Sequence, residues 1–178
     1  MKRYLAADFG AGSGRVIVGT VETQNITSIQ LEEIHRFENN QKIIDGHLRW
    51  DFEALFNELK IGLKKAFAKY GDEIESIGVD TWGVDFGLLD EDGKLISTPV
   101  CYRDDRTKGM LELAFQKLPK EEFFQHAANQ FMEINTAFQL LSSVSELESA
   151  EKLLFMPDLF NYFLTGKCYN EFTISSTS

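Results

Sequence analysis

The sequence predicts an α/β fold in which helices flank a β-sheet, and two observations support this prediction. Apolar runs near residues 3–8, 15–21 and 28–37 have strand character, so three consecutive strands open the chain. After Asp51 the apolar residues recur every three or four positions, which indicates a helix. The apolar run at Ile77-Gly78-Val79 then predicts another strand. This order is typical of a sheet that helices cover.

Local signals predict the individual elements. Asp45-Gly46 is the turn sequence of a tight hairpin. The helix that ends at Gly71 has one apolar face, formed by Phe52, Leu55, Phe56, Leu59, Leu63 and Phe67. Beyond Arg106 the chain becomes mainly helical, and we expect its periodic phenylalanines, among them Phe115, Phe123, Phe124 and Phe138, to pack in the core. Pro157 suits the first turn of a short helix, and Gly166 suits its end.

The stretch Asp8-Phe9-Gly10-Ala11-Gly12-Ser13-Gly14-Arg15 joins two of these strands through a glycine-rich turn. We expect its glycines to adopt positive φ values, which would turn successive backbone N–H groups into a nest for phosphate. Asp8 could organise a hydrated metal ion, and Arg15 could meet phosphate oxygens. A Walker loop and the dinucleotide fingerprint both lead into a helix, so neither fits here. An ordinary hairpin with a solvated Asp8 remains the alternative.

Four segments, in order along the chain, resemble the FGGY carbohydrate kinases, which are sugar and polyol kinases of the actin-like ATPase superfamily. The glycine-rich hairpin is the first segment. The others are Val79-Asp80-Thr81-Trp82-Gly83-Val84-Asp85-Phe86, Tyr102-Arg103-Asp104-Asp105-Arg106-Thr107, and Met156 to Lys167 with its Pro-Asp and Leu-Thr-Gly elements. Ile34-His35-Arg36-Phe37 and Trp50-Asp51 add a closer similarity to the rhamnulokinases within that family.

The resemblance implies a ribonuclease H-like domain with a mixed sheet flanked by helices. Residues 1–178 would form the N-terminal portion of the N-terminal lobe. ATP and Mg²⁺ are the implied cofactors. Asp8 would hold the magnesium ion through water, and Arg15 would offset charge on the transferred group. The ATP phosphates would lie along Ala11, Gly12, Ser13 and Gly14.

The resemblance also implies a small sugar as substrate, bound after the strand that ends near Thr81. Gly83 would let the backbone approach the sugar, and Trp82 could offer an apolar face to its C–H groups or pack as a half-buried core aromatic. Asp85, Asp104 and Arg106 could bond sugar hydroxyls, or could instead form a local ion-pair network that fixes the loop.

The implied reaction is phosphoryl transfer from ATP to the C1 hydroxyl of L-rhamnulose, in rhamnose catabolism. The family's general base is an Asp in a Gly/Ser-His-Asp-type segment, and we expect it beyond Ser178. The second lobe, which supplies most of the adenine site, is the partner that this chain lacks. We therefore expect a fragment that does not turn over by itself.

Composition narrows the functional classes. The formal net charge of −10 argues against a nucleic-acid binder, because no basic stripe is visible in the sequence. No apolar run approaches the span of a bilayer and no signal peptide is visible, so we expect a cytoplasmic protein without a membrane partner. Cys101 and Cys168 are expected to be free thiols.

Two alternatives stay open. One is a sister kinase that acts on xylulose, ribulose, fuculose or glycerol, which sequence does not separate from a kinase of rhamnulose. The other is a non-catalytic actin-like module, in which the hairpin binds nucleotide to bias a partner interaction. Such a module has no use for the Thr-Trp-Gly-Val-Asp and Tyr-Arg-Asp-x-Arg elements.

Overall fold

The computed structural model describes residues 2–22 and 28–176, which form two compact units. The first unit comprises residues 1–40 and 51–82, and the second comprises residues 41–50 and 83–178. Among the described residues, no helix combines the length and the apolar character that crossing a membrane requires.

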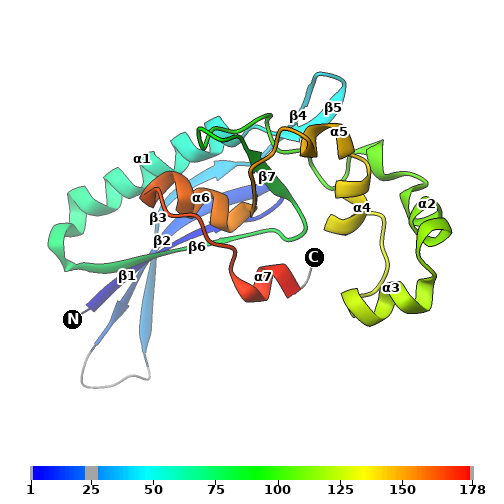
Figure 1. Cartoon of the computed structure of the whole chain (residues 1–178). Coiled ribbons are helices and arrows are strands. Elements are labelled where there is room, and N and C mark those ends of the chain that lie inside the picture. Colours follow the sequence, from blue (N-terminus) through cyan, green and yellow to red (C-terminus); the bar gives the residue numbers. More distant parts are fainter. Residues whose placement is uncertain (1, 23–27, 177–178) are drawn as a thin grey trace. The chain divides into compact units, whose positions relative to one another are not determined.

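The first unit is built on a four-stranded mixed sheet of order β3-β2-β1-β6 (Figure 1). Its strands are β1 (Lys2–Phe9), β2 (Ser13–Val21), β3 (Ile29–Glu38) and β6 (Ile74–Thr81). The first three strands pair antiparallel, and β6 pairs parallel to β1. The three predicted opening strands and the mixed character of the sheet are therefore confirmed.

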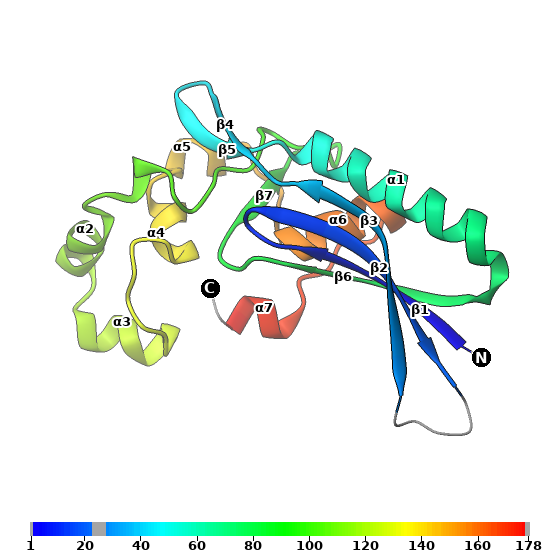
Figure 2. The same cartoon turned by 180° about the vertical axis from the view of Figure 1, so that it is seen from behind.

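Helix α1 (Phe52–Tyr70) packs on one face of this sheet, as the views in Figures 1 and 2 both show. Asp51 caps its start by accepting the N–H of Ala54 at 3.1 Å, and Gly71 ends it with a φ of 51°. The short 3₁₀ turn η1 (Gly71–Glu73) then leads into β6. The buried side chains between helix and sheet are Leu5, Ala7, Phe9, Val16, Val18, Leu55, Leu59 and Ala66.

Two antiparallel pairs of strands organise the second unit. β4 (Gln41–Ile44) and β5 (His47–Trp50) form the predicted hairpin, and Asp45 and Gly46 at its tip both have positive φ, as its turn type requires. β7 (Phe86–Leu89) pairs with β8 (Lys152–Phe155) across 62 intervening residues, and Phe86, Leu88 and Phe155 form a core cluster there. Neither this pairing nor β8 was predicted, because four-residue apolar runs carry no clear period.

The rest of the second unit is mainly helical, as predicted. The helices are η2 (Asp105–Thr107), α2 (Met110–Lys117), α3 (Lys120–Ala127), α4 (Thr136–Leu141), α5 (Val144–Leu147), α6 (Met156–Thr165) and α7 (Phe172–Ser176). Pro157 lies in the first turn of α6, and Gly166 ends that helix with a φ of 71°, so both cap predictions are confirmed.

The expectation that the phenylalanines beyond Arg106 are core is right for Phe115, Phe123 and Phe138 and wrong for Phe124, and Phe67 of the predicted apolar helix face is also exposed. Phe115, Phe123 and Phe138 pack together with Phe131, largely edge to face. Phe124 on α3 is 51% exposed and Phe67 on α1 is 44% exposed. The Phe124 ring still contacts that of Phe131 edge to face, and helical spacing alone could not separate these partly exposed residues from buried ones.

Gly62, in the middle of α1, lies where the helix packs closely against the sheet. A Cβ atom added there would lie 2.4 Å from Cγ2 of Val16 on β2. We expect Gly62→Ala to lower the free energy of unfolding by about 1–3 kcal/mol, although alanine is the better helix former. Urea unfolding of Gly62→Ala, and of the double variant with Val16→Ala, measures this. A more stable Gly62→Ala protein, or no rescue in the double variant, contradicts the account.

Candidate functional site

The β1–β2 hairpin, the predicted phosphate cradle, is closed and anchored by backbone contacts. Phe9 lies opposite Gly14, and the N–H of Gly10 donates to the carbonyl of Ser13 at 2.9 Å. Asn39 directly follows β3, is 2% exposed, and holds the turn through two hydrogen bonds. Its side-chain amide donates to the carbonyl of Gly10 at 2.9 Å, and its backbone N–H donates to the carbonyl of Gly12 at 3.2 Å. Because carbonyl oxygens repel phosphate, holding two of them on Asn39 favours anion binding at the turn.

The hairpin glycines serve another purpose than the one predicted. The glycines with positive φ in the described residues are Gly46, Gly71, Gly93, Gly109 and Gly166, so the expectation of positive φ at Gly10, Gly12 and Gly14 is wrong. A Cβ on Gly14 would lie 2.2 Å from the ring of Phe37, whereas a Cβ on Gly12 would meet no atom within 4 Å in the part of the chain that the structure describes. Packing against Phe37 therefore requires Gly14, and the space beside Gly12 is open.

Four charged residues occupy one row across the sheet beside this hairpin. The strand registers place Asp80, Asp8, Arg15 and Arg36 on β6, β1, β2 and β3 respectively. Arg15 donates to Oδ2 of Asp8 from Nε at 2.9 Å and from Nη2 at 2.7 Å. Glu33 raises the pKa of Arg36 by a hydrogen bond and by its charge, with a smaller contribution from Asp8. The row thus places two carboxylates and two guanidinium groups at the end of β1.

The carboxylates of this row fit a hydrated magnesium ion. Asp8 keeps 34% of its side chain exposed, and Asp80, which the sequence analysis did not select, is exposed in the neighbouring register position. Over residues 2–22 and 28–176 no cluster of three or more His, Cys, Asp or Glu side chains could enclose a metal ion. Magnesium in phosphoryl-transfer sites keeps several waters and uses one or two carboxylates together with substrate phosphates, which these two residues could supply.

The predicted sugar loop begins where β6 ends. The hydroxyl of Thr81 donates to the carbonyl of Trp82 at 2.8 Å, and Trp82 is half-buried. The next residue, Gly83, has no positive φ, and a Cβ placed on it would have a single neighbour within 4 Å in the described residues, Cδ1 of Ile174 at 4.0 Å. Neither backbone conformation nor described packing requires a glycine at this position.

Asp85 is a buried carboxylate at the start of β7, and N–H donors surround it. Its side chain accepts the indole N–H of Trp50 at 2.6 Å, the backbone N–H of Tyr102 at 3.1 Å and the side-chain amide of Gln139 at 2.9 Å. Since Asp85 is 1% exposed, these bonds place it inside the unit. Gln139, which is fully buried on α4, was not found from the sequence because an interior glutamine has no pattern of its own.

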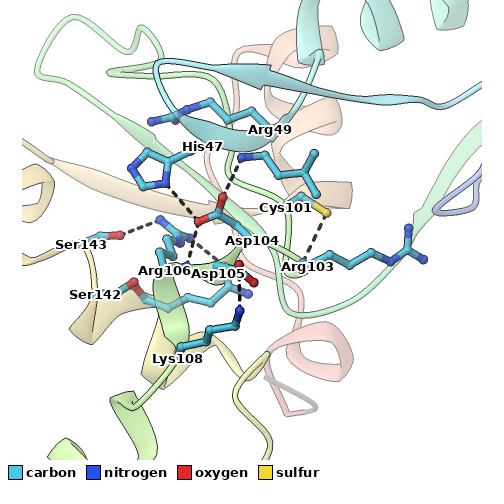
Figure 3. A network of polar contacts seen from close by, with 12 residues as sticks. His47, Arg49, Cys101, Arg103, Asp104, Asp105, Arg106, Lys108, Ser142 and Ser143 are labelled. Atoms are coloured by element: carbon cyan, nitrogen blue, oxygen red, sulfur yellow. Dashed lines mark hydrogen bonds and ion pairs between the residues drawn. The ribbon is translucent and has the colours of Figure 1, made fainter.

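Asp104 and Arg106 belong to a second part of the same network (Figure 3). The Asp104 carboxylate accepts the backbone N–H groups of Leu48 at 2.7 Å and Arg106 at 3.0 Å, and it contacts Nδ1 of His47 at 3.0 Å. Arg106 donates to Ser143 at 2.7 Å and to Gln139 at 2.8 Å. Burial lowers the pKa of Arg106, and the charges of Glu146, Asp85 and Asp104 oppose that change. Hydrogen bonds through a backbone N–H group and Gln139 therefore connect Asp104, Arg106 and Asp85.

Cys101 and Arg103, which Figure 3 also labels, show no feature of a catalytic residue. Cys101 is buried, and that burial raises the pKa of its thiol to about 11, so it is a thiol and not a nucleophilic thiolate at neutral pH. Cys168 is also a free thiol. Arg103 is exposed and its guanidinium lies over the ring of Tyr102.

Comparison with protein families and curated proteins gives two results. Residues 3–178 match the family described as "FGGY family of carbohydrate kinases, N-terminal domain". The chain is 43% identical, over 99% of its length, to a protein named rhamnulokinase from Bacteroides thetaiotaomicron, and 43% identical, over its whole length, to one of the same name from Halalkalibacterium halodurans. It spans only 36% and 38% of the length of these relatives.

Solved structures show the same fold at much lower sequence identity. A ligand-bound xylulose kinase from Lactobacillus acidophilus has a TM-score of 0.82 at 14% identity, with 99% of this chain and 36% of that chain covered. A Plasmodium falciparum glycerol kinase with ADP has a TM-score of 0.74 at 17% identity, with 99% and 37% covered. The fold is therefore that of sugar and polyol kinases, represented here over part of its length.

Gly12 and Gly14, two of the three hairpin glycines, should respond differently to replacement by alanine. We expect Gly14→Ala to cost about 1–3 kcal/mol of unfolding free energy, because the Phe37 ring must move. Gly12→Ala should stay within about 0.5 kcal/mol of the parent chain, because its Cβ enters open space. Urea unfolding of both variants measures the difference. Equal losses in the two variants would show that packing does not distinguish these glycines.

Asp104 predicts a dependence of stability on pH. Burial alone would raise the pKa of this carboxyl, but the hydrogen bonds from Leu48, His47 and Arg106 together lower it. Its stabilisation is therefore complete above the unfolded pKa of about 3.9 and is lost as pH falls through the lower folded pKa.

We expect the stability difference between the parent chain and Asp104→Asn to be largest near neutral pH and to shrink below about pH 4. The matched control is Asp105→Asn, which removes an exposed carboxylate paired with Lys108 at 2.8 Å and should change stability little at any pH. Thermal unfolding between pH 3 and 7 decides. A difference that does not vary with pH would contradict the ionic role of Asp104.

Proposed function

Because the chain belongs to the FGGY family of carbohydrate kinases, we propose that it is part of an ATP-dependent kinase of L-rhamnulose. The complete protein transfers the γ-phosphate of ATP to the sugar and forms L-rhamnulose 1-phosphate, in rhamnose catabolism. Two relatives named rhamnulokinase, each 43% identical, support this substrate over other ketoses and polyols. Residues 1–178 make up the N-terminal portion of the N-terminal lobe of that cytoplasmic enzyme.

Gly83 is the observation that carries the proposal for this chain. Neither Gly83 nor Gly78 has a described packing contact or backbone conformation that requires glycine, but only Gly83 lies beyond the end of β6, where a ligand could come close to the backbone. Gly83 follows β6, and ligands of open α/β sheets bind at the carboxyl ends of strands. We therefore assign the sugar contact to Gly83, with Thr81 and Trp82 lining the same loop.

The hairpin serves as the phosphate site. Ala11, Gly12, Ser13 and Gly14 line the ATP phosphates, backbone N–H groups of the turn bind them, and the space beside Gly12 in the described residues admits them. The Asp8 carboxylate, assisted by Asp80, holds a hydrated magnesium ion, which neutralises phosphate charge when bound. Arg15, already paired with Asp8, offsets charge that develops on the transferred group.

Asp85, Asp104 and Arg106 support the sugar loop in this proposal. Asp85 accepts hydrogen bonds from Trp50, Tyr102 and Gln139, which fixes the segment that follows Gly83, and Asp104 and Arg106 bind Leu48 and Gln139 next to it. The general base lies outside residues 1–178, as does the second lobe with most of the adenine site. We propose that this chain alone releases no ADP in response to L-rhamnulose, because half of a cleft cannot exclude water or hold both substrates.

The test compares two glycine variants of the complete protein. Gly83→Ala should raise the KM for L-rhamnulose about tenfold or more without changing the KM for ATP or the melting temperature, because the methyl group occupies space that the sugar needs. The matched control is Gly78→Ala on β6, where an added Cβ would meet no atom of the described residues within 4 Å. A panel with D-xylulose, L-ribulose, L-fuculose and glycerol establishes which substrate is preferred.

The outcomes separate the possibilities. If Gly83→Ala behaves like Gly78→Ala, the sugar does not contact Gly83. Faster turnover of another ketose would assign the chain to a sister kinase. Nucleotide binding without any sugar-dependent ADP formation by the complete protein would favour a binding module.

A further inference from the structure

Val84, directly after Gly83, has a backbone conformation that valine rarely adopts. Its φ is 66°, and the N–H of Asp85 donates to the carbonyl of Gly83 at 2.9 Å, across Val84. A hydrogen bond from residue i+2 to residue i around a positive φ defines the rare, strained form of the γ-turn. For a β-branched residue such a conformation is an outlier.

Strained turns persist only where neighbouring groups hold them, and α4 supplies those groups here. The carbonyl of Val84 accepts the hydroxyl of Thr136 at 2.7 Å and the side-chain amide of Gln139 at 3.3 Å. Both side chains are buried, Thr136 with 5% and Gln139 with none of its surface exposed. The same Gln139 amide bonds Asp85, so the turn is held at two successive residues.

The orientation of Gln139 is fixed by its partners. Its Oε1 atom accepts from Arg106 at 2.8 Å, and a guanidinium can only donate. The amide nitrogen must therefore face the oxygens of Val84, Asp85 and Ile134. The hydrogen bond from Arg106 thus fixes the orientation of the Gln139 amide, with its nitrogen directed at the turn.

We propose that Thr136 and Gln139 are positioning residues of the sugar site, which hold the γ-turn at Val84 so that Gly83 presents one fixed backbone geometry to the substrate. This inference rests on the proposed function. The branched side chain of Val84 reduces the number of backbone conformations available to the turn. Thr136 and Gln139 stabilise the conformation with positive φ by their hydrogen bonds to the Val84 carbonyl. A glycine at 84 would adopt the same φ without strain, but it would also leave the loop free to adopt others.

The first test removes one hydrogen bond from the turn of the complete protein. Thr136→Val keeps the side-chain shape and deletes the hydroxyl, and we expect the KM for L-rhamnulose to rise about five- to tenfold while the KM for ATP stays unchanged. Thr136→Ser retains the hydroxyl and should return the KM to within about twofold of the parent value. The control is Thr165→Val on α6, which deletes a hydroxyl that donates to the carbonyl of Asn161 at 2.8 Å and accepts the backbone N–H of Lys167 at 3.2 Å.

The second test releases the turn without removing its hydrogen bonds. Val84→Gly should raise the KM for the sugar by a similar factor while the melting temperature is unchanged or higher, because backbone strain is relieved. If the turn is merely structural, Val84→Gly and Thr136→Val leave the sugar KM unchanged, and that result overturns the inference. If the parent protein phosphorylates no sugar of the panel, the proposed function fails and the inference fails with it.

Discussion

The second unit depends on the buried carboxylate of Asp85. Taking a carboxylate out of water is costly unless hydrogen bonds replace its hydration, and removing one partner of such a group is more damaging than removing both. Here the donors come from β5, from the segment after Cys101 and from α4. One side chain therefore fixes three segments that are far apart in the sequence, and the turn that precedes it is held as a result.

In the first unit, the turn between β1 and β2 places backbone N–H groups and the Asp8 carboxylate at one end of the sheet. The hairpin residues do so with negative φ values, and the side-chain amide of Asn39 holds the turn by its hydrogen bond to the carbonyl of Gly10. Gly14 gives room to Phe37, and Gly12 leaves space on the open side. The pair of Asp8 and Arg15 adds opposite charges that a metal ion and a phosphate could each use.

Most of the first unit could be predicted from the sequence, because its elements are long and carry a clear period. Their apolar periods predicted the 19-residue helix α1 and the strands of eight to ten residues that form the sheet against which it packs. The short pair β7 and β8 was missed, since its pairing depends on tertiary contacts. The site shows the same division. Asp8, Gly83 and Asp104 lie in motifs, whereas Asn39, Thr136 and Gln139 act through contacts that only folding creates.

The central claim is that the hairpin binds phosphate and that the loop at Gly83 binds sugar in one kinase. A crystal structure of the complete protein with L-rhamnulose and a non-hydrolysable ATP analogue tests this most directly. The account predicts phosphate oxygens within hydrogen-bond distance of the backbone N–H groups between Ala11 and Gly14, and the sugar in van der Waals contact with Gly83. A nucleotide bound away from the hairpin, or a sugar bound away from Gly83, would contradict it.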